Sequence, residues 1–143
     1  AINLGIVPDE KDKMKSALEQ ALASADVILT SGGVSVGPKD FTPQVVDSLG
    51  NPGGIISGVA MKPGKPLTIA VVNGKLIFSL PGNPTSSLFM FIEFVRPIIV
   101  KLAGRPEEEM PKVKAVAAQK MFSARGRRTP TRCEFSPPGS VFH

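Results

Sequence analysis

A glycine-rich run that also carries hydroxyl groups is the clearest candidate for chemistry in this sequence. It reads Thr-Ser-Gly-Gly-Val-Ser-Val-Gly-Pro-Lys-Asp from Thr30 to Asp40 and follows a short apolar stretch. Glycines allow backbone N–H groups to approach a ligand closely, and hydroxyl groups add further hydrogen-bond donors. The run predicts a phosphate- or oxyanion-binding loop, although a tight turn without a ligand explains the glycines equally well. Its candidate ligand contacts are Thr30, Ser31, Gly32, Gly33, Ser35 and Gly37.

Two carboxylates stand next to apolar or glycine-rich segments. Asp40 closes the glycine-rich run, where it could hold a divalent cation or repel a misplaced anion. Asp9, with Glu10 after it, follows the first apolar stretch. On local grounds alone, a helix N-cap explains Asp9 better than a functional acid does.

A second candidate segment places two lysines three positions apart. It reads Met-Lys-Pro-Gly-Lys-Pro and contains Lys62, Gly64 and Lys65. The two prolines and the glycine fix a kinked backbone, and paired ammonium groups on a rigid backbone suit a compact dianion. A surface loop with two ordinary lysines is the simpler interpretation of this segment alone.

The third candidate segment, Leu80-Pro-Gly-Asn-Pro-Thr-Ser-Ser87, joins a predicted strand to a predicted helix. The first-turn N–H groups of a helix, with a serine beside them, can face an anion. Capping of the helix by Asn83, Thr85 or Ser86 is the alternative, and it does not exclude anion binding. The candidate ligand contacts are Pro81, Gly82, Asn83, Pro84 and Ser86.

Hydrophobic periodicity indicates the elements that must position these segments. Helices are predicted over 11–24, from Thr42 onward with Pro43 at the first helical position, and over 85–102, where Pro97 should kink the helix or loosen its hydrogen bonds locally. Strands are predicted over 2–7, 26–30, 55–61, 67–72 and 75–80, the last two joined by an Asn-Gly hairpin turn. This alternation predicts an α/β domain with a largely parallel sheet and an antiparallel edge. The candidate loops should then converge at the carboxyl edge of the sheet.

Composition argues against several classes of function. Cys133 is the only cysteine, and the only histidine, His143, is the last residue, so cysteine metal clusters and histidine catalysis are not expected. No apolar run is long enough for a membrane span. The net charge of +5 is concentrated after Gly104, but aromatic residues are not interleaved with the basic ones. We therefore do not expect nucleic acid as a partner.

The pattern changes after Gly104, where strands are predicted over 112–122 and 132–135. We expect residues 1–104 to form the α/β domain and residues 105–143 to be an incomplete β domain or an irregular tail. The sequence begins inside an apolar run without an initiator methionine. We therefore expect it to be part of a longer protein.

The ordered trio of segments beginning at Thr30, Met61 and Leu80 resembles the bacterial MoeA and eukaryotic gephyrin family of molybdenum insertases. The resemblance extends almost continuously over residues 1–104. It implies a three-layer α/β/α sandwich and an enzyme that inserts molybdate into adenylylated molybdopterin with Mg²⁺-dependent release of AMP. It also implies a cytoplasmic homodimer that works beside a molybdopterin adenylyltransferase.

The resemblance also implies roles for the candidate residues. Asp9 and Asp40 match acidic positions tied to Mg²⁺ and pterin handling, and residues 30–37 match the pterin-phosphate loop. Lys62 and Lys65, with Gly64 between them, match the lysines near molybdate. The segment from Pro81 to Ser86 matches a second substrate loop.

The sequence departs from the family pattern at both ends. The family's sheet begins one strand and one helix earlier, so we expect the isolated chain to be inactive. Arg127, Arg128 and Arg132 match an arginine-bearing strand of the family only loosely. The alternatives are a molybdopterin adenylyltransferase of the same fold, whose first loop is usually Gly-Gly-Thr-Gly, and a gephyrin-like receptor-binding scaffold.

Overall fold

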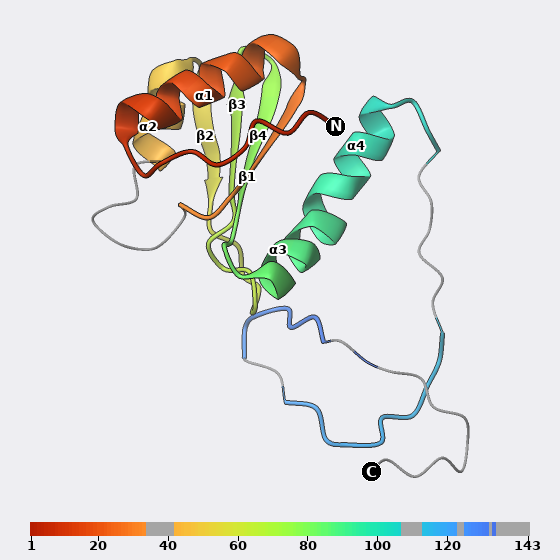
Figure 1. The fold of residues 1–143 in the computed structure, drawn as a ribbon. Helices are drawn as coiled ribbons and strands as arrows, with labels where there is room; N and C mark the ends of the chain where they lie inside the picture. The colour runs from red at the N-terminus through yellow and green to blue at the C-terminus, as the bar shows by residue number, and fades with distance from the viewer. Residues whose placement is uncertain (34–41, 107–112, 123–124, 132, 134–143) are drawn as a thin grey trace.

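The computed structural model describes residues 1–33, 42–106, 113–122, 125–131 and 133. Helices and strands alternate over residues 11–57, and two further strands and a helical segment follow up to residue 102 (Figure 1). The elements are α1 (Lys11–Ser24), β1 (Val27–Ser31), α2 (Thr42–Leu49), β2 (Pro52–Ser57), β3 (Thr68–Val72), β4 (Lys75–Leu80), α3 (Pro84–Met90), the π-helix η1 (Phe91–Val95) and α4 (Arg96–Leu102).

The four strands form one mixed sheet in the order β1-β4-β3-β2. The β1–β4 pairing is parallel, whereas β4–β3 and β3–β2 are antiparallel. The predicted hairpin is confirmed, and Asn73 and Gly74 both adopt positive φ values, 50° and 79°, as a type I′ turn requires. Because β2, β3 and β4 follow one another as antiparallel neighbours, the described sheet is not mostly parallel, and β4 lies inside it rather than at an edge.

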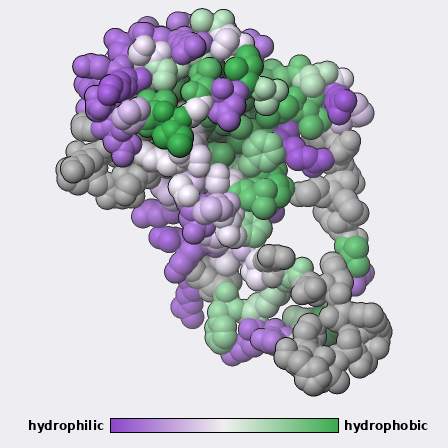
Figure 2. All heavy atoms as spheres, viewed as in Figure 1, coloured by the Kyte–Doolittle hydropathy of each residue, from purple (hydrophilic) through white to green (hydrophobic). Residues whose placement is uncertain are grey.

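Helices cover both faces of the sheet, which confirms the three-layer α/β/α arrangement. Successive side chains of a strand point to opposite faces. On β4, Ile77 therefore joins a hydrophobic cluster with Leu18 and Val45 from α1 and α2, and Phe78 joins a second cluster with Met90 from α3. Figure 2 shows hydrophilic residues gathered over the outer side of α1 and α2, with hydrophobic residues between the helical layers.

The long helical segment from Pro84 to Leu102 is continuous but not uniformly α-helical. Proline has no N–H group and disturbs the preceding helical turn. Just before Pro97, the backbone N–H of Arg96 donates to the carbonyl oxygen of Phe91, five residues earlier. The predicted loosening near Pro97 therefore takes the form of a π-helical turn.

Two predicted strands are wrong within the described residues. Residues 2–7 form no strand, because Gly5 has a φ of 81° and donates its N–H to the side-chain oxygen of Asn3 over 2.8 Å. This local turn replaces the extended backbone that a strand needs. Residues 113–122 are also irregular and mostly exposed, since no described strand pairs with them. The strand predicted over 132–135 lies almost entirely outside the described residues.

None of the described helices combines the length and apolarity needed to cross a bilayer. The predictions for α1 and β4 agree with the structure in both bounds. The strand predicted over 55–61 is β2, which begins and ends earlier in the chain.

Candidate functional site

Two of the three candidate loops meet at the carboxyl edge of the parallel pair β1–β4. The N–H of Gly32, just after β1, donates to the carbonyl oxygen of Leu80, the last residue of β4, over 3.2 Å. A Cβ atom at Gly82 would lie 3.4 Å from the Cα atom of Gly32. The two loop backbones therefore lie close together, and a methyl group at Gly82 would make an ordinary van der Waals contact with Gly32.

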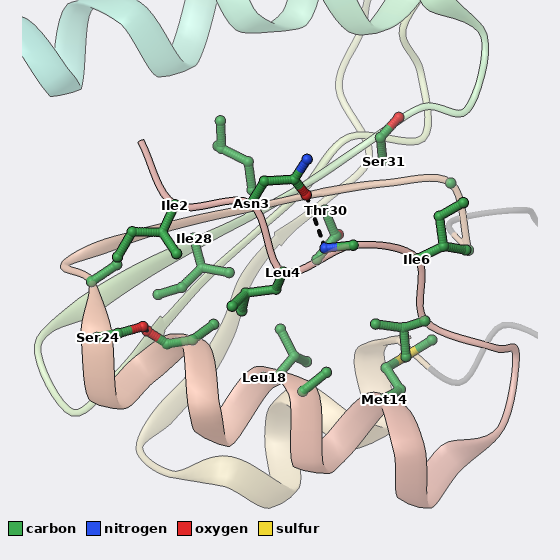
Figure 3. A pocket seen from close by; sticks show the side chains of 18 of the residues that line it. Ile2, Asn3, Leu4, Ile6, Met14, Leu18, Ser24, Ile28, Thr30 and Ser31 are labelled. Carbon is green, nitrogen blue, oxygen red and sulfur yellow. Dashed lines mark hydrogen bonds between the residues drawn. The ribbon is translucent and has the colours of Figure 1, made fainter.

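A cavity of about 510 Å³ lies beside this contact, between the N-terminal segment, α1 and β1 (Figure 3). Figure 3 shows Leu18 and Met14 reaching into it from α1 and Thr30 beside it on β1, whereas the Ser31 side chain points away from α1. Much of the wall is apolar. Five predicted site residues also line it, namely Asp9, Thr30, Ser31, Gly32 and Gly33.

Asp9 lies at this cavity and does not cap α1. The N-cap residue of α1 is Glu10, whose side chain makes no capping hydrogen bond. Asp9 is the only acidic residue among those described that line the cavity. One carboxylate together with phosphate oxygens from a bound ligand would be a donor set that suits Mg²⁺. No cluster of three or more potential metal ligands occurs among the described residues, so a cation here would depend on substrate oxygens.

Two buried hydroxyl groups beneath the loops have no hydrogen-bond partner. They are Oγ1 of Thr30 and Oγ of Ser79. Ser79 is only 1% exposed. An unpaired buried hydroxyl costs about 1–3 kcal/mol, so its presence needs a reason. Ser79 was not among the residues predicted from the sequence, although a serine within the apolar strand Lys75–Leu80 could have marked it as a candidate.

The third loop does cap a helix, as its alternative interpretation predicted. The side-chain oxygen of Asn83 accepts hydrogen bonds from the backbone N–H of Ser86 over 3.1 Å and from its hydroxyl over 3.3 Å. Pro84 occupies the first helical position. Ser86 is 7% exposed, so a ligand would have to compete with Asn83 for its donors.

The lysine loop presents both ammonium groups to solvent on a fixed backbone. Lys62 and Lys65 are exposed, whereas Gly64 between them is buried. Gly64 has a φ of 120°, and a Cβ atom there would lie 2.3 Å from Cε of Met90. The loop therefore packs on α3, the helix that the third loop begins.

The chain around Arg128 returns to the lysine loop. The N–H of Arg128 donates to Ala60 O over 2.9 Å, and Arg128 O accepts from the N–H of Lys62 over 3.1 Å. The Arg128 guanidinium also lies 3.1 Å from a carboxylate oxygen of Glu93 on η1. The preceding residue, Arg127, is exposed. The candidates Ser35, Gly37, Asp40 and Arg132 lie outside the described residues.

Comparison with known proteins decides the family. Residues 1–101 match the family model described as "Probable molybdopterin binding domain". The chain belongs to this molybdopterin-binding domain family. Its resemblance to the molybdenum-insertase branch is also supported. The chain is 38% identical over 127 residues to a molybdopterin molybdenumtransferase of Haemophilus influenzae, covering 88% of this chain and 31% of that protein.

Other similar proteins support the same family assignment. A gephyrin from Dictyostelium discoideum is 38% identical over 120 residues, covering 72% of this chain and 16% of that protein. A solved structure of the molybdopterin biosynthesis MoeA protein from Pyrococcus horikoshii superposes with a TM-score of 0.62 at 39% identity, covering 71% of this chain and 24% of that one. The chain thus spans less than a third of the length of these relatives.

Proposed function

We propose that this chain is the substrate-binding α/β domain of a molybdenum insertase, which transfers molybdate to adenylylated molybdopterin and releases AMP. The contact between Gly32 and Leu80 carries this proposal, because it brings the glycine-rich loop after β1 and the loop that begins α3 together at one edge of the sheet. The cavity beside it supplies apolar walls and the Asp9 carboxylate.

The proposal gives each group of candidate residues a separate role. The N–H groups and hydroxyls from Thr30 to Gly33 bind the substrate phosphates. Lys62 and Lys65, with Arg128 beside them, attract molybdate through their positive charge. Asp9 would hold Mg²⁺ together with Asp40, which lies outside the described residues. Bound Mg²⁺ would neutralise charge that develops when water cleaves the phosphoanhydride and AMP leaves.

The remaining parts of the proposal concern the full-length protein. Because the chain spans less than a third of the relatives' length, we propose that further segments and a second subunit complete the site. The isolated chain should then show no turnover. The proposed protein acts in the cytoplasm, beside the adenylyltransferase that supplies its substrate.

A chimera tests the proposal while supplying the rest of the enzyme. Residues 1–101 of this chain, which match the family model, would replace the corresponding segment of the Haemophilus influenzae relative. The chimera, incubated with adenylylated molybdopterin, MgCl₂ and molybdate, should release AMP and form molybdenum cofactor. Lys62→Ala with Lys65→Ala should abolish cofactor formation, whereas the exposed helical Lys101→Ala is a matched control.

Each alternative function has its own outcome in this experiment. Adenylylation of molybdopterin by the chimera with ATP would identify an adenylyltransferase instead. A folded chimera that binds no substrate but captures a receptor-loop peptide would identify a scaffold.

A further inference from the structure

Burial repeats every three residues along the lysine loop. Met61, Gly64 and Leu67 are buried, whereas Lys62 and Lys65, each one position after a buried residue, are exposed. The loop therefore has an inner row of residues that faces the core and an outer row that carries the two ammonium groups.

Met90 of α3 fills the space beneath the centre of this loop. It is fully buried, and it shares a hydrophobic cluster with Met61 and Leu67, the two ends of the inner row. A Cβ atom at Gly64 would lie 2.3 Å from Cε of Met90 and 2.7 Å from its Sδ. Because Gly64 has no side chain, the tip of the methionine lies directly against the loop backbone.

Two backbone hydrogen bonds close the loop beside this contact. The N–H of Val59 donates to the carbonyl oxygen of Lys65 over 2.9 Å, and the N–H of Leu67 donates to that of Gly64 over 3.2 Å. Both acceptor carbonyls belong to Gly64 or to the residue after it. Loss of the contact between Met90 and Gly64 should therefore loosen both bonds.

We propose that Met90 is a positioning residue for Lys62 and Lys65. Its side chain supports Gly64, and so it fixes the spacing of the two lysine backbones before an anion arrives. A loop that is ordered in advance loses less entropy on binding, which raises its affinity for the ligand. The inference rests on the proposed function, in which the two lysines attract molybdate.

Exchange of backbone amide hydrogens in the 143-residue chain, followed by NMR, tests whether Met90 orders the loop. Met90→Ala should accelerate exchange at Val59 and Leu67 about tenfold more than at Leu76, whose N–H donates to Asp26 O beside β4. Met90→Leu keeps most of the side-chain volume, so both rates should return to within about threefold of those in the unsubstituted chain.

Molybdate binding by the same variants, measured by calorimetry with sodium molybdate, tests the consequence for the lysines. Met90→Ala should weaken binding roughly threefold to tenfold, since the loop must then become ordered on binding. Met90→Leu should bind molybdate within about twofold of the unsubstituted chain. Unchanged affinity in a Met90→Ala chain whose loop amides exchange faster would overturn the positioning role.

Val95→Ala is the matched control. Val95 is fully buried in the same hydrophobic cluster but lies on η1, whereas the atoms nearest to a Cβ at Gly64 all belong to Met90. The control should lower overall stability without changing molybdate affinity or the exchange of the loop amides relative to Leu76. Equal acceleration of the loop amides by Val95→Ala and Met90→Ala would show that Met90 contributes only to the core, which overturns the inference.

A nuclear Overhauser measurement on the unsubstituted chain tests the contact without any variant. The Met90 methyl group should show a strong cross-peak to the α-hydrogens of Gly64, and its absence would overturn the inference even if Met90→Ala failed to fold. A chain that shows this cross-peak and the expected exchange rates but binds no molybdate would contradict the proposed function. The same result would support the ordering of the lysine loop by Met90.

Discussion

The N–H of Gly32 donates to Leu80 O over 3.2 Å, which fastens the loop after β1 to the loop after β4. The two residues are 48 positions apart in the sequence. Their strands pair in parallel, so both loops leave the same edge of the sheet. This contact joins the glycine-rich segment after β1 and the segment that contains Gly82 into one surface beside the cavity.

Gly64→Ala should destabilise the domain by about 2–4 kcal/mol, because the new Cβ atom would lie 2.3 Å from Met90 Cε at a φ of 120°. Urea denaturation followed by circular dichroism measures this. Gly74→Ala is the matched control, since it also has a positive φ but no atom within 4 Å of the new Cβ. Equal losses for the two variants would show that Met90 does not restrict the lysine loop.

Asn83→Ala should lower the free energy of unfolding by roughly 1 kcal/mol, since the cap of α3 is lost. Asn83→Ser should retain most of the stability, because a serine hydroxyl can accept the same hydrogen bond. Thermal unfolding of both variants distinguishes them. Identical stability of Asn83→Ala and the unsubstituted chain would mean that the cap contributes nothing.

Arg128→Ala should change stability by less than about 1 kcal/mol, because the Arg128 side chain of the Glu93 ion pair is 70% exposed. The small effect should shrink further in 1 M NaCl, where surface charges are screened. Glu93→Gln should reproduce it. A loss of several kcal/mol that persists in high salt would show that the guanidinium contributes through packing instead.

Most elements of the fold that were predicted correctly are specified by local patterns in the sequence. The apolar repeat of α1 and the Asn-Gly turn between β3 and β4 act over a few residues, so they specify those elements directly. Strand pairing is not local. Apolar runs in the sequence do not indicate that β2 pairs with β3 in an antiparallel manner. The strand predicted over 2–7 does not form, because the turn at Asn3 and Gly5 interrupts the extended backbone.

Some residues of the candidate site could be predicted from the sequence, and others depend on long-range contacts. The glycines and lysines were found because their spacing is visible in the sequence, and Thr30, Ser31, Gly32 and Gly33 do line one cavity with Asp9. The pairing of Ser79 with Thr30 depends on the register of two distant strands, which no local pattern encodes. The approach of Arg128 to the lysine loop is likewise a long-range contact.

Amide NMR during a titration with adenylylated molybdopterin tests most directly whether the two glycine loops form one binding site. The backbone N–H signals of Gly32, Gly33, Gly82 and Asn83 should shift together and follow a single dissociation constant. Gly74 and Gly104, which lie in the β3–β4 turn and just after α4, should not shift. Shifts confined to one loop, or none in either, would contradict the account.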